Sequence, residues 1–502
     1  MDFSLVHNLA LGFGTALSFQ NLFYCFMGVL LGTLIGVLPG IGPLATIAML
    51  LPVTFSLPPV SALIMLAGIY YGAQYGGSTT SILVNLPGEA ASVITCIDGY
   101  QMARQGRAGP ALAISAMGSF FAGCVATVVI ALFAPPLAEV ALKFGPAEYF
   151  ALMVLGLVGA TVLAHGSLIK AIAMTILGLL LGLVGTDVNS GMARYTFGLS
   201  ELSDGIGFVI VAMGIFGLAE IISNLEQEGK GATEVFVHKV SGLMPTWKDL
   251  KSSSGAILRG TAIGCSLGIL PGGGALLSSF AAYTLEKKIG DPSMFGKGEI
   301  RGVAAPEAAN NAGAQASFIP LLTLGIPSNP VMALMIGAMM IQGIAPGPQV
   351  MTERPQLFWG MIVSMWIGNL MLVILNLPLI GMWVKLLTVP YRILYPAILL
   401  FCSVGVYSLS NQPFDVMLMA IFGLLGWIWR KMECEPAPMI LGFILGPLME
   451  ENLRRAMLLS RGDPSVFATK PICAVLLGIS IALLLVTLAP AVRKTREEAF
   501  VE

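Results

Sequence analysis

Long apolar segments recur along the whole chain, separated by short stretches rich in glycine, proline and charged residues. The apolar segments lie near residues 20–38, 43–74, 110–135, 147–164, 167–185, 205–224, 255–284, 313–345, 357–386, 393–410, 414–429, 436–449 and 471–490. Because about 20 apolar residues span a bilayer as a helix, these segments predict about twelve spanning or half-spanning helices. They do not alternate apolar and polar residues as barrel strands do. The pattern therefore predicts an all-α polytopic membrane protein.

One polar stretch, residues 226–254, divides the apolar segments into two groups. It is the longest charged stretch in the sequence that could form a solvated loop. The expected organisation is a first membrane repeat at 1–225, a polar connecting loop at 226–254, a second membrane repeat with further C-terminal helices at 255–492, and a tail at 493–502. Arg493, Lys494 and Arg496 follow the last apolar segment, so the positive-inside rule predicts a cytoplasmic C-terminus. No Lys or Arg precedes Arg104, so the first apolar segment is expected to stay as a helix and not to be cleaved as a signal peptide.

Composition excludes several classes of protein. Charged residues make up 11% of the 502 residues, which is far below the roughly 25% of soluble domains and excludes a water-soluble enzyme. A net charge of −1 gives no basic surface for nucleic acid, and the high apolar content excludes intrinsic disorder. The seven cysteines are scattered without a CxxC pair, so we interpret them as small buried apolar residues.

An internal repeat links the two groups of segments. Residues 28–44 read GVLLGTLIGVLPGIGPL, and residues 260–276 read GTAIGCSLGILPGGGAL, the same pattern displaced by 232 positions. In both copies glycine recurs at every fourth position, namely at Gly28, Gly32, Gly36 and Gly40 and at Gly260, Gly264, Gly268 and Gly272. Such spacing places the glycines on one face of a helix, where another backbone can approach closely.

Each glycine face meets a proline, Pro39 or Pro271, and the LPGxG sequence predicts a helix break inside the membrane. A single break of this kind is more often a kink than a site. Further downstream, SILVNLP (81–87) resembles LLTLGIP (321–327), and GYQMARQGRAGP (99–110) resembles GAMMIQGIAPGP (337–348). Paired broken segments in two halves point to the binding site of a secondary transporter. The relative direction of the two halves stays open at this point.

Polar side chains gather after both breaks. The first group is Tyr75, Ser78, Thr79, Thr80, Ser81 and Asn85, and the second is Glu307, Asn310, Asn311, Gln315, Ser317, Thr323, Ser328 and Asn329. Any one hydroxyl is best explained by a hydrogen bond to its own or a neighbouring helix. Four consecutive hydroxyl residues after two glycines instead favour contact with a dehydrated Na⁺ or a carboxylate. Glu89 and Asp98 are weaker candidates for cation binding, with a role as loop residues favoured.

Enzyme motifs find no support. GCSLG at 264–268 matches the GxSxG nucleophile pattern, but no histidine follows Ser266 and its glycines already belong to the repeat. GDPSMFGKGE at 290–299 lacks the spacing and the hydroxyl of an ATP-binding loop. Zinc motifs such as HExxH are absent from the sequence. Ion-gradient coupling and passive conduction remain.

The motifs GVLPGIG, YGGSTTSILVNLPGE, GILPGGG and IPLLTLGIP together resemble the large membrane subunit of the tripartite tricarboxylate transporters, from about residue 20 to the C-terminal helix. This resemblance implies a multi-pass protein of the bacterial inner membrane. It also implies two partners, a small four-helix membrane subunit and a periplasmic substrate-binding protein that delivers a di- or tricarboxylate. In similar systems a gradient of Na⁺ or H⁺ drives uptake, with an elevator-like movement. No organic cofactor is expected.

The same resemblance implies a substrate and ion site on residues of both halves. Carried over to this chain, the site is Gly40, Gly42, Ser78, Thr79, Thr80, Ser81, Asn85, Gly272, Gly274, Asn310, Asn311, Ser317 and Thr323. The breaks and their surroundings add Pro39, Tyr75, Gly77, Pro271 and Pro327, and the candidate Na⁺ positions lie near Gly40, Ser78, Gly272 and Asn310. Helix N-termini at the breaks would attract a polyanion without an arginine. The alternatives are a stand-alone carboxylate carrier or channel and, more remotely, an intramembrane enzyme that uses Ser266.

Overall fold

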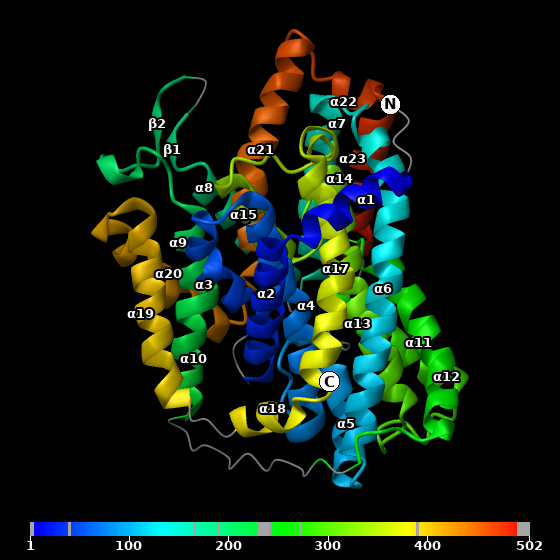
Figure 1. The fold of residues 1–502 in the computed structure, drawn as a ribbon. Coiled ribbons are helices and arrows are strands. Elements are labelled where there is room, and N and C mark those ends of the chain that lie inside the picture. The colour runs from blue at the N-terminus through cyan, green and yellow to red at the C-terminus, as the bar shows by residue number, and fades with distance from the viewer. Residues whose placement is uncertain are drawn as a thin grey trace.

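The computed structural model describes residues 5–38, 42–164, 167–187, 190–228, 240, 242–270, 274–387 and 391–488. These residues are almost entirely helical (Figure 1), which confirms the all-α class. The helices of the first half are α1 (Leu5–Ala16), α2 (Phe19–Val37), α3 (Pro43–Phe55), α4 (Pro59–Val84), η1 (Ala90–Ser92), α5 (Val93–Arg104), α6 (Ala108–Ala141), α7 (Pro146–Leu163), α8 (Leu168–Gly182), η2 (Ser200–Leu202), α9 (Phe208–Ala212), η3 (Met213–Leu218) and α10 (Ala219–Glu228). Between α8 and η2, the short antiparallel strands β1 (Gly185–Thr186) and β2 (Ala193–Arg194) pair with each other.

The second half continues the same helical architecture. Its helices are α11 (Trp247–Leu267), α12 (Gly274–Ile289), α13 (Arg301–Ala316), α14 (Phe318–Leu324), α15 (Pro330–Ile341), α16 (Gln349–Glu353), α17 (Pro355–Asn376), α18 (Ile380–Leu386), α19 (Tyr391–Ser410), α20 (Pro413–Lys431), α21 (Ala437–Leu459), α22 (Val466–Thr469) and α23 (Pro471–Leu488). The segments 39–41 and 271–273, and with them Pro39, Gly40, Pro271 and Gly272, lie outside the described residues, as does the tail at 493–502.

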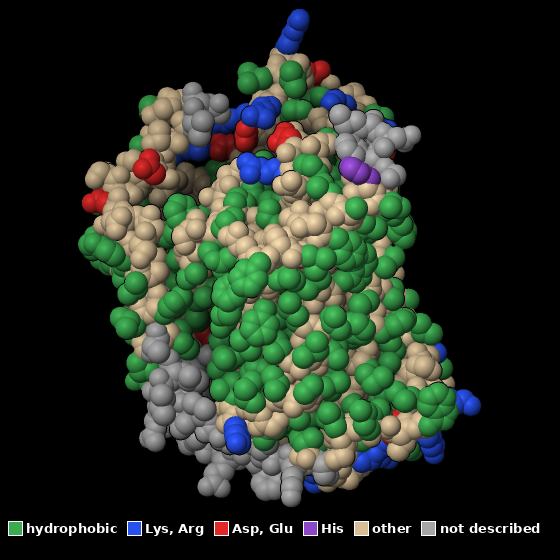
Figure 2. All heavy atoms as spheres, in the orientation of Figure 1, with side chains coloured by type: hydrophobic (Ala, Val, Ile, Leu, Met, Phe, Trp, Pro, Cys, Tyr) green, Lys and Arg blue, Asp and Glu red, His purple; other side chains and the backbone are tan. Residues whose placement is uncertain are grey.

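Many large apolar side chains are exposed on the surface of the molecule. Figure 2 shows hydrophobic side chains over the central band of the visible face and most of the charged side chains at its two ends. Among the described residues, five helices are long and apolar enough to cross a membrane, namely α2, α6, Phe208–Glu226, α17 and α20, and six shorter apolar helices accompany them. Large apolar side chains such as Phe133 and Leu485 are 61% and 63% exposed. A surface of this kind is matched to lipid, so the chain is a polytopic membrane protein.

The repeated glycine faces pack two pairs of helices in the same way. α2 lies against α4, and a Cβ placed on Gly32 would be 2.4 Å from the carbonyl oxygen of Ile69. α11 lies against α13, and a Cβ on Gly264 would be 2.5 Å from the carbonyl oxygen of Ala309. Only glycine permits these backbone contacts. The packing partners, at positions 69 and 309, are 240 residues apart, so the repeat includes them as well.

The partner helices also end alike. α4 ends at Val84, and Asn85 follows with a left-handed backbone (φ 59°); α14 ends at Leu324, and Gly325 follows with φ 70°. A left-handed residue at this position terminates a helix. The two halves differ in one respect, because α4 is continuous where the second half is divided into α13 and α14. Pro320 has no N–H to bond the carbonyl of Ala316 one turn earlier, which accounts for the division.

The repeats have inverted directions. α6 and α17 follow equivalent segments and lie side by side, with Trp366 Nε1 donating to the carbonyl of Cys124 at 3.1 Å. Further along, Leu112 and Asn376 line one small cavity. Residue numbers therefore rise along α6 as they fall along α17, and Figure 1 shows the two helices starting at opposite ends of the molecule. Inverted repeats are common among secondary transporters.

Both ends of the polar stretch 226–254 are helical. α10 continues to Glu228, and α11 begins at Trp247. Thr246 caps α11, because its hydroxyl accepts from the Asp249 N–H at 3.2 Å while the Asp249 carboxylate accepts from the Thr246 N–H at 3.0 Å. Residues 247–254, which the sequence analysis places in the loop, thus form the first turns of α11. Residues 229–239 and 241 lie outside the described residues.

Candidate functional site

A cavity of about 520 Å³ lies between the two repeats and a set of flanking helices. From the repeats, its wall includes Gly42, Tyr70, Gln74, Glu89, Ala275 and Asn329. From the helices outside the repeated motifs, which we call the flanking helices, it includes Phe216, Glu220 and Arg430, and from the turn after α20 it includes Glu435. Its volume falls in the range of small-molecule sites, roughly 300–1,000 Å³. Phe216 belongs to the π-helical turn η3, a type of irregularity that is frequent at functional sites.

Several helices begin at this cavity. Gly42 is the N-cap of α3, Ala275 is the second residue of α12, and Asn329 is the N-cap of α15. The first N–H groups of a helix have no partner within the helix, and the helix dipole adds a partial positive charge there. Equivalent helices of both repeats, α3 and α12, thus direct their N-termini to the same space. This arrangement suits an anion.

Two polar residues stabilise the broken segments at the wall. Glu89 Oε2 accepts from the Ala91 N–H at 2.9 Å, and its Oε1 accepts from Asn310 Nδ2 at 3.0 Å. In the second half, Asn329 Oδ1 accepts from the Met332 N–H at 3.0 Å. Glu89 therefore caps η1 after the turn that ends α4, and Asn329 caps α15 after the turn that ends α14.

The flanking side of the wall carries an ion pair between Arg430 of α20 and Glu220 of α10. The Arg430 side chain is 30% exposed, so part of it is accessible from the cavity. A guanidinium group binds carboxylates in a bidentate manner. The sequence predicted an anion site formed by helix N-termini without an arginine, and in the structure Arg430 lies beside these N-termini.

A buried carboxyl group, Glu307 on α13, lies at the centre of a separate polar cluster. Ser78 of α4 donates to its Oε2 at 2.5 Å, Ser115 of α6 donates to the same oxygen at 3.2 Å, and Thr95 of α5 donates to Oε1. Glu307 is 0% exposed. Hydroxyl donors from three helices therefore surround one carboxyl group at the junction of the two repeats, where they satisfy a group that would otherwise be costly to bury.

Four of the sequence-predicted site residues lie at the cavity or directly behind its wall. Gly42 lines it, and Asn310 binds the wall residue Glu89. A Cβ on Gly77 would be 3.0 Å from Cγ of Glu89, and one on Gly274 would be 3.3 Å from Nδ2 of Asn329. The structure thus brings residues of both repeats together at one place.

The four hydroxyl residues 78–81 point elsewhere and are not part of the cavity wall. Ser78 binds Glu307, and Ser81 donates to the hydroxyl of Ser92 at 3.0 Å. Thr80 donates to the carbonyl of Val37 on α2 at 2.8 Å, a contact between packed helices. All are buried. Their assignment to the substrate site stays a prediction.

Thr79, the fourth hydroxyl residue, and Tyr75 line a small cavity of about 10 Å³ beside α6 and α17. Thr79 bonds back to the carbonyl of Tyr75 at 3.3 Å. Asn85 forms the left-handed end of α4. Tyr75, Thr79 and Asn85 do not line the larger cavity.

In the second half, the predicted polar residues Asn311, Ser317 and Thr323 form hydrogen bonds with other groups of the chain and do not line the larger cavity. Asn311 Nδ2 donates to the Ser119 hydroxyl at 2.7 Å. Ser317 and Thr323 bond back to carbonyl groups of their own helices at 2.5 and 2.7 Å. Pro327 lies in the turn between α14 and α15.

Sequence reasoning did not select the wall residues Tyr70, Gln74 and Arg430, and it ranked Glu89 low. One signal was available, because the alignment of SILVNLP with LLTLGIP at an offset of 240 also pairs Glu89 with Asn329. Both residues are caps in the structure. Arg430 gave no comparable signal, since it comes from a helix outside the repeat.

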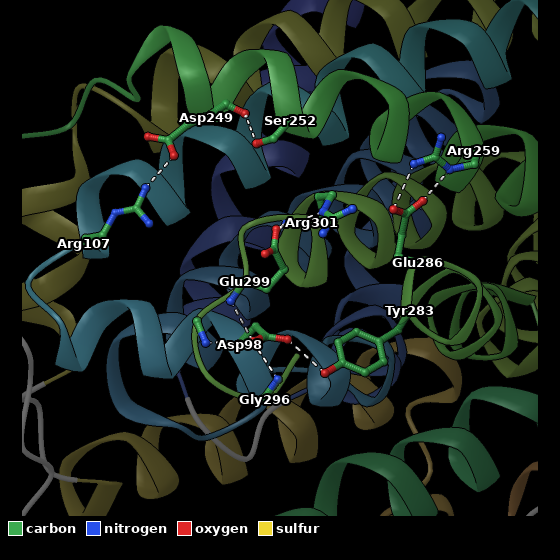
Figure 3. A network of polar contacts seen from close by, with 11 residues as sticks. Asp98, Arg107, Asp249, Ser252, Arg259, Tyr283, Glu286, Gly296, Glu299 and Arg301 are labelled. Atoms are coloured by element: carbon green, nitrogen blue, oxygen red, sulfur yellow. Dashed lines mark hydrogen bonds and ion pairs between the residues drawn. The ribbon is translucent and has the colours of Figure 1, made fainter. Parts of the chain in front are cut away.

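Asp98, the other weaker candidate, belongs to a polar network (Figure 3) and lies on α5, which Figure 1 shows near one end of the molecule. Its Oδ1 accepts from the N–H groups of Gly296, Gly298 and Glu299 at 2.8–2.9 Å, and its Oδ2 accepts from the Tyr283 hydroxyl at 2.9 Å. These bonds anchor the loop after α12 to α5. Asp98 therefore has a structural role, away from the cavity wall.

Figure 3 also contains two ion pairs that join different helices. Arg107 binds Asp249 at 2.6 Å, and Arg259 binds Glu286 through two hydrogen bonds of 2.5 and 2.9 Å.

The described residues contain no group of three or more His, Cys, Asp or Glu that would hold a metal ion. Ser266 is exposed on α11 and donates to the carbonyl of Ala262 one turn earlier at 2.8 Å.

Comparison with known proteins places the chain in a family. Residues 22–441 match the family described as the tripartite tricarboxylate transporter TctA family. A protein of Agrobacterium vitis described as "Uncharacterized 52.8 kDa protein in TAR-I ttuC' 3'region" is 60% identical over 99% of both chains. A second protein of that organism, "Uncharacterized protein in TAR-II ttuC' 3'region", is 60% identical over 48% of this chain and 99% of its own length. No solved structure matches. The chain belongs to the tripartite tricarboxylate transporter TctA family.

Proposed function

We propose that this chain is the large membrane subunit of a binding-protein-dependent secondary transporter that imports a di- or tricarboxylate by alternating access. The observation that carries this proposal is the convergence of helix N-termini from both repeats on one cavity. The three helix starts and Arg430 supply positive potential to a space that is otherwise mostly apolar. A small polycarboxylate matches this space in size, and the helix N-termini favour its negative charge.

Alternating access is supported by the location of the cavity. One side of its wall belongs to the repeats. A glycine face packs two helices closely within each repeat, and the hydrogen bonds Asn310–Glu89 and Asn329–Tyr70 join the two repeats. The other side belongs to η3, α10 and α20. A movement of the repeat body against these flanking helices would carry the site from one membrane face to the other, as in an elevator. A gradient of Na⁺ or H⁺ is the proposed energy source.

The proposed partners are a small four-helix membrane subunit and a periplasmic binding protein, and the proposed location is the bacterial inner membrane. Arg107 of the network in Figure 3 directly precedes α6, which begins at one end of the molecule in Figure 1. By the positive-inside rule, we assign this end to the cytoplasm. The opposite end would then receive substrate from the binding protein. No enzymatic activity and no nucleic-acid partner are proposed.

Uptake of labelled carboxylates into proteoliposomes tests this function. The vesicles contain the chain and its small subunit, and the assay is run with and without the binding protein and with and without a cation gradient. We expect uptake of a di- or tricarboxylate only when both are present. Uptake that is indifferent to the binding protein would instead identify a stand-alone carrier. Loss of activity on Ser266→Ala in a folded protein would support the enzymatic alternative.

A further inference from the structure

The charges on the cavity wall are unfavourable for an anion. The charged wall residues are Glu89, Glu220, Glu435 and Arg430, which are three carboxylates and one guanidinium group. Arg430 is already paired with Glu220. A polycarboxylate that enters this cavity therefore meets like charges, and their repulsion is strong where water is excluded.

Glu89 is the wall carboxylate whose charge is least compensated. Its hydrogen bonds come from an uncharged backbone N–H and an uncharged amide, those of Ala91 and Asn310. Within the described part of the chain, it forms no ion pair with Lys or Arg. A second carboxyl group, Glu307, lies one helical turn from Asn310 on α13 and adds to the negative character of this region.

Two amide oxygens in this region also lack hydrogen-bond donors. Gln74 lines the same cavity and is 1% exposed, and its Oε1 has no partner among the described residues. Asn310 is likewise 1% exposed; its Nδ2 binds Glu89, while its Oδ1 has no described partner. Buried acceptors without donors are costly and call for a missing positive group.

Carboxylate and amide oxygens are the ligands that hard cations prefer. We propose that Glu89, with the amide oxygens of Gln74 and Asn310, binds one alkali-metal cation, and that this cation allows the cavity to hold a polycarboxylate. The inference rests on the proposed function and gives its cation a location. The bound ion neutralises Glu89, satisfies the orphaned oxygens and replaces repulsion of the substrate by attraction. Cation and carboxylate therefore bind together, as symport requires.

The first test measures cation binding without any carboxylate. The full chain in lipid nanodiscs is melted in increasing NaCl, with ionic strength and pH held constant by N-methylglucamine chloride. We expect Na⁺ to raise the melting temperature of the wild type in a saturable manner, because a ligand of the folded state stabilises it. Glu89→Gln should abolish the shift. Glu353→Gln, which removes the same charge from an exposed position on α16, should leave it unchanged.

A second variant guards against misfolding of the first. Gln74→Leu keeps the size of the side chain and removes one proposed ligand, so the Na⁺ concentration for half the shift should rise roughly tenfold, equivalent to about 1.4 kcal/mol. A wild type that Na⁺ does not stabilise, or an Na⁺ shift that survives in Glu89→Gln, would overturn the proposal. So would carboxylate uptake that follows a pH gradient and ignores Na⁺.

The two proposals fail separately. If the Na⁺ shift depends on Glu89 but no carboxylate is taken up by the complete system, the cation site stands and the proposed function falls. If a carboxylate is taken up but the Na⁺ shift is the same in the wild type and in Glu89→Gln, the function stands and the cation site falls.

Discussion

Asn310 and Glu89 are joined across the two repeats by a hydrogen bond of 3.0 Å, and the equivalent positions of the inverted repeat are joined as well. Adding 240 to positions 70 and 89 gives 310 and 329, and Asn329 Nδ2 donates to the Tyr70 hydroxyl at 3.3 Å. Thus α13 of the second repeat binds the turn that follows α4, and α4 of the first repeat binds the turn that follows α14. One hydrogen bond therefore links each turn to the opposite repeat.

This cross-repeat contact predicts an energetic coupling between Asn310 and Glu89. In a double-mutant cycle of Asn310→Ala and Glu89→Ala, we expect a coupling of about 1 kcal/mol in the free energy of unfolding, the usual contribution of one buried hydrogen bond. Thermal unfolding of the four proteins in Na⁺-free buffer measures it. The matched cycle of Asn310→Ala with Glu353→Ala should be additive. Equal coupling in both cycles would contradict a specific contact.

The glycine faces predict a sharp difference between two otherwise similar substitutions. Gly264→Ala would place a methyl group 2.5 Å from the carbonyl oxygen of Ala309, so α11 and α13 would have to separate. We expect a loss of about 1–3 kcal/mol in stability. Gly14→Ala on α1 meets no described atom within 4 Å and should have little effect or a slightly stabilising one. Melting temperatures in detergent compare the two.

At the cavity, Gly42→Ala tests function without disturbing the fold. A Cβ on Gly42 meets no described atom within 4 Å, and the backbone there (φ −78°) suits any residue. Stability should therefore change by less than about 0.5 kcal/mol. Because the methyl group would enter the proposed substrate space, we expect the KM for carboxylate uptake to rise roughly tenfold, or about 1.4 kcal/mol. An unchanged KM would show that the substrate does not approach α3.

The sequence predicted the fold class, the repeat and its glycine faces, because these follow from composition and from regular spacing. The ends of α2 at Val37 and of α11 at Leu267 agree with the predicted breaks, whose prolines Pro39 and Pro271 lie outside the described residues. The sequence predicted the cavity wall less well, since membership of the wall depends on which way each side chain faces. Thr80 and Gln74 lie six positions apart on one helix, yet Thr80 bonds to α2 and Gln74 lines the cavity. Arg430 was beyond prediction, because it comes from a helix with no counterpart in the repeat motifs.

Arg430 and Glu220 provide the last test, because their pairing has two explanations with opposite consequences. If Arg430 binds substrate, Glu220 competes with the carboxylate for the same guanidinium group. Arg430→Gln should then raise the KM for uptake by about tenfold or more, the loss of one charged hydrogen bond. Glu220→Gln should leave the KM equal or lower, since it frees the guanidinium group.

If the pair is instead purely structural, both substitutions should lower the melting temperature alike and affect the KM alike, because each leaves one partner unpaired. The double variant separates the two explanations further. Under the substrate-binding explanation it should behave like Arg430→Gln alone, since Glu220 acts only through Arg430. Arg104→Gln, at an exposed position on α5, controls for the loss of a positive charge. A KM that falls in Glu220→Gln and rises in Arg430→Gln would therefore place the substrate carboxylate at Arg430.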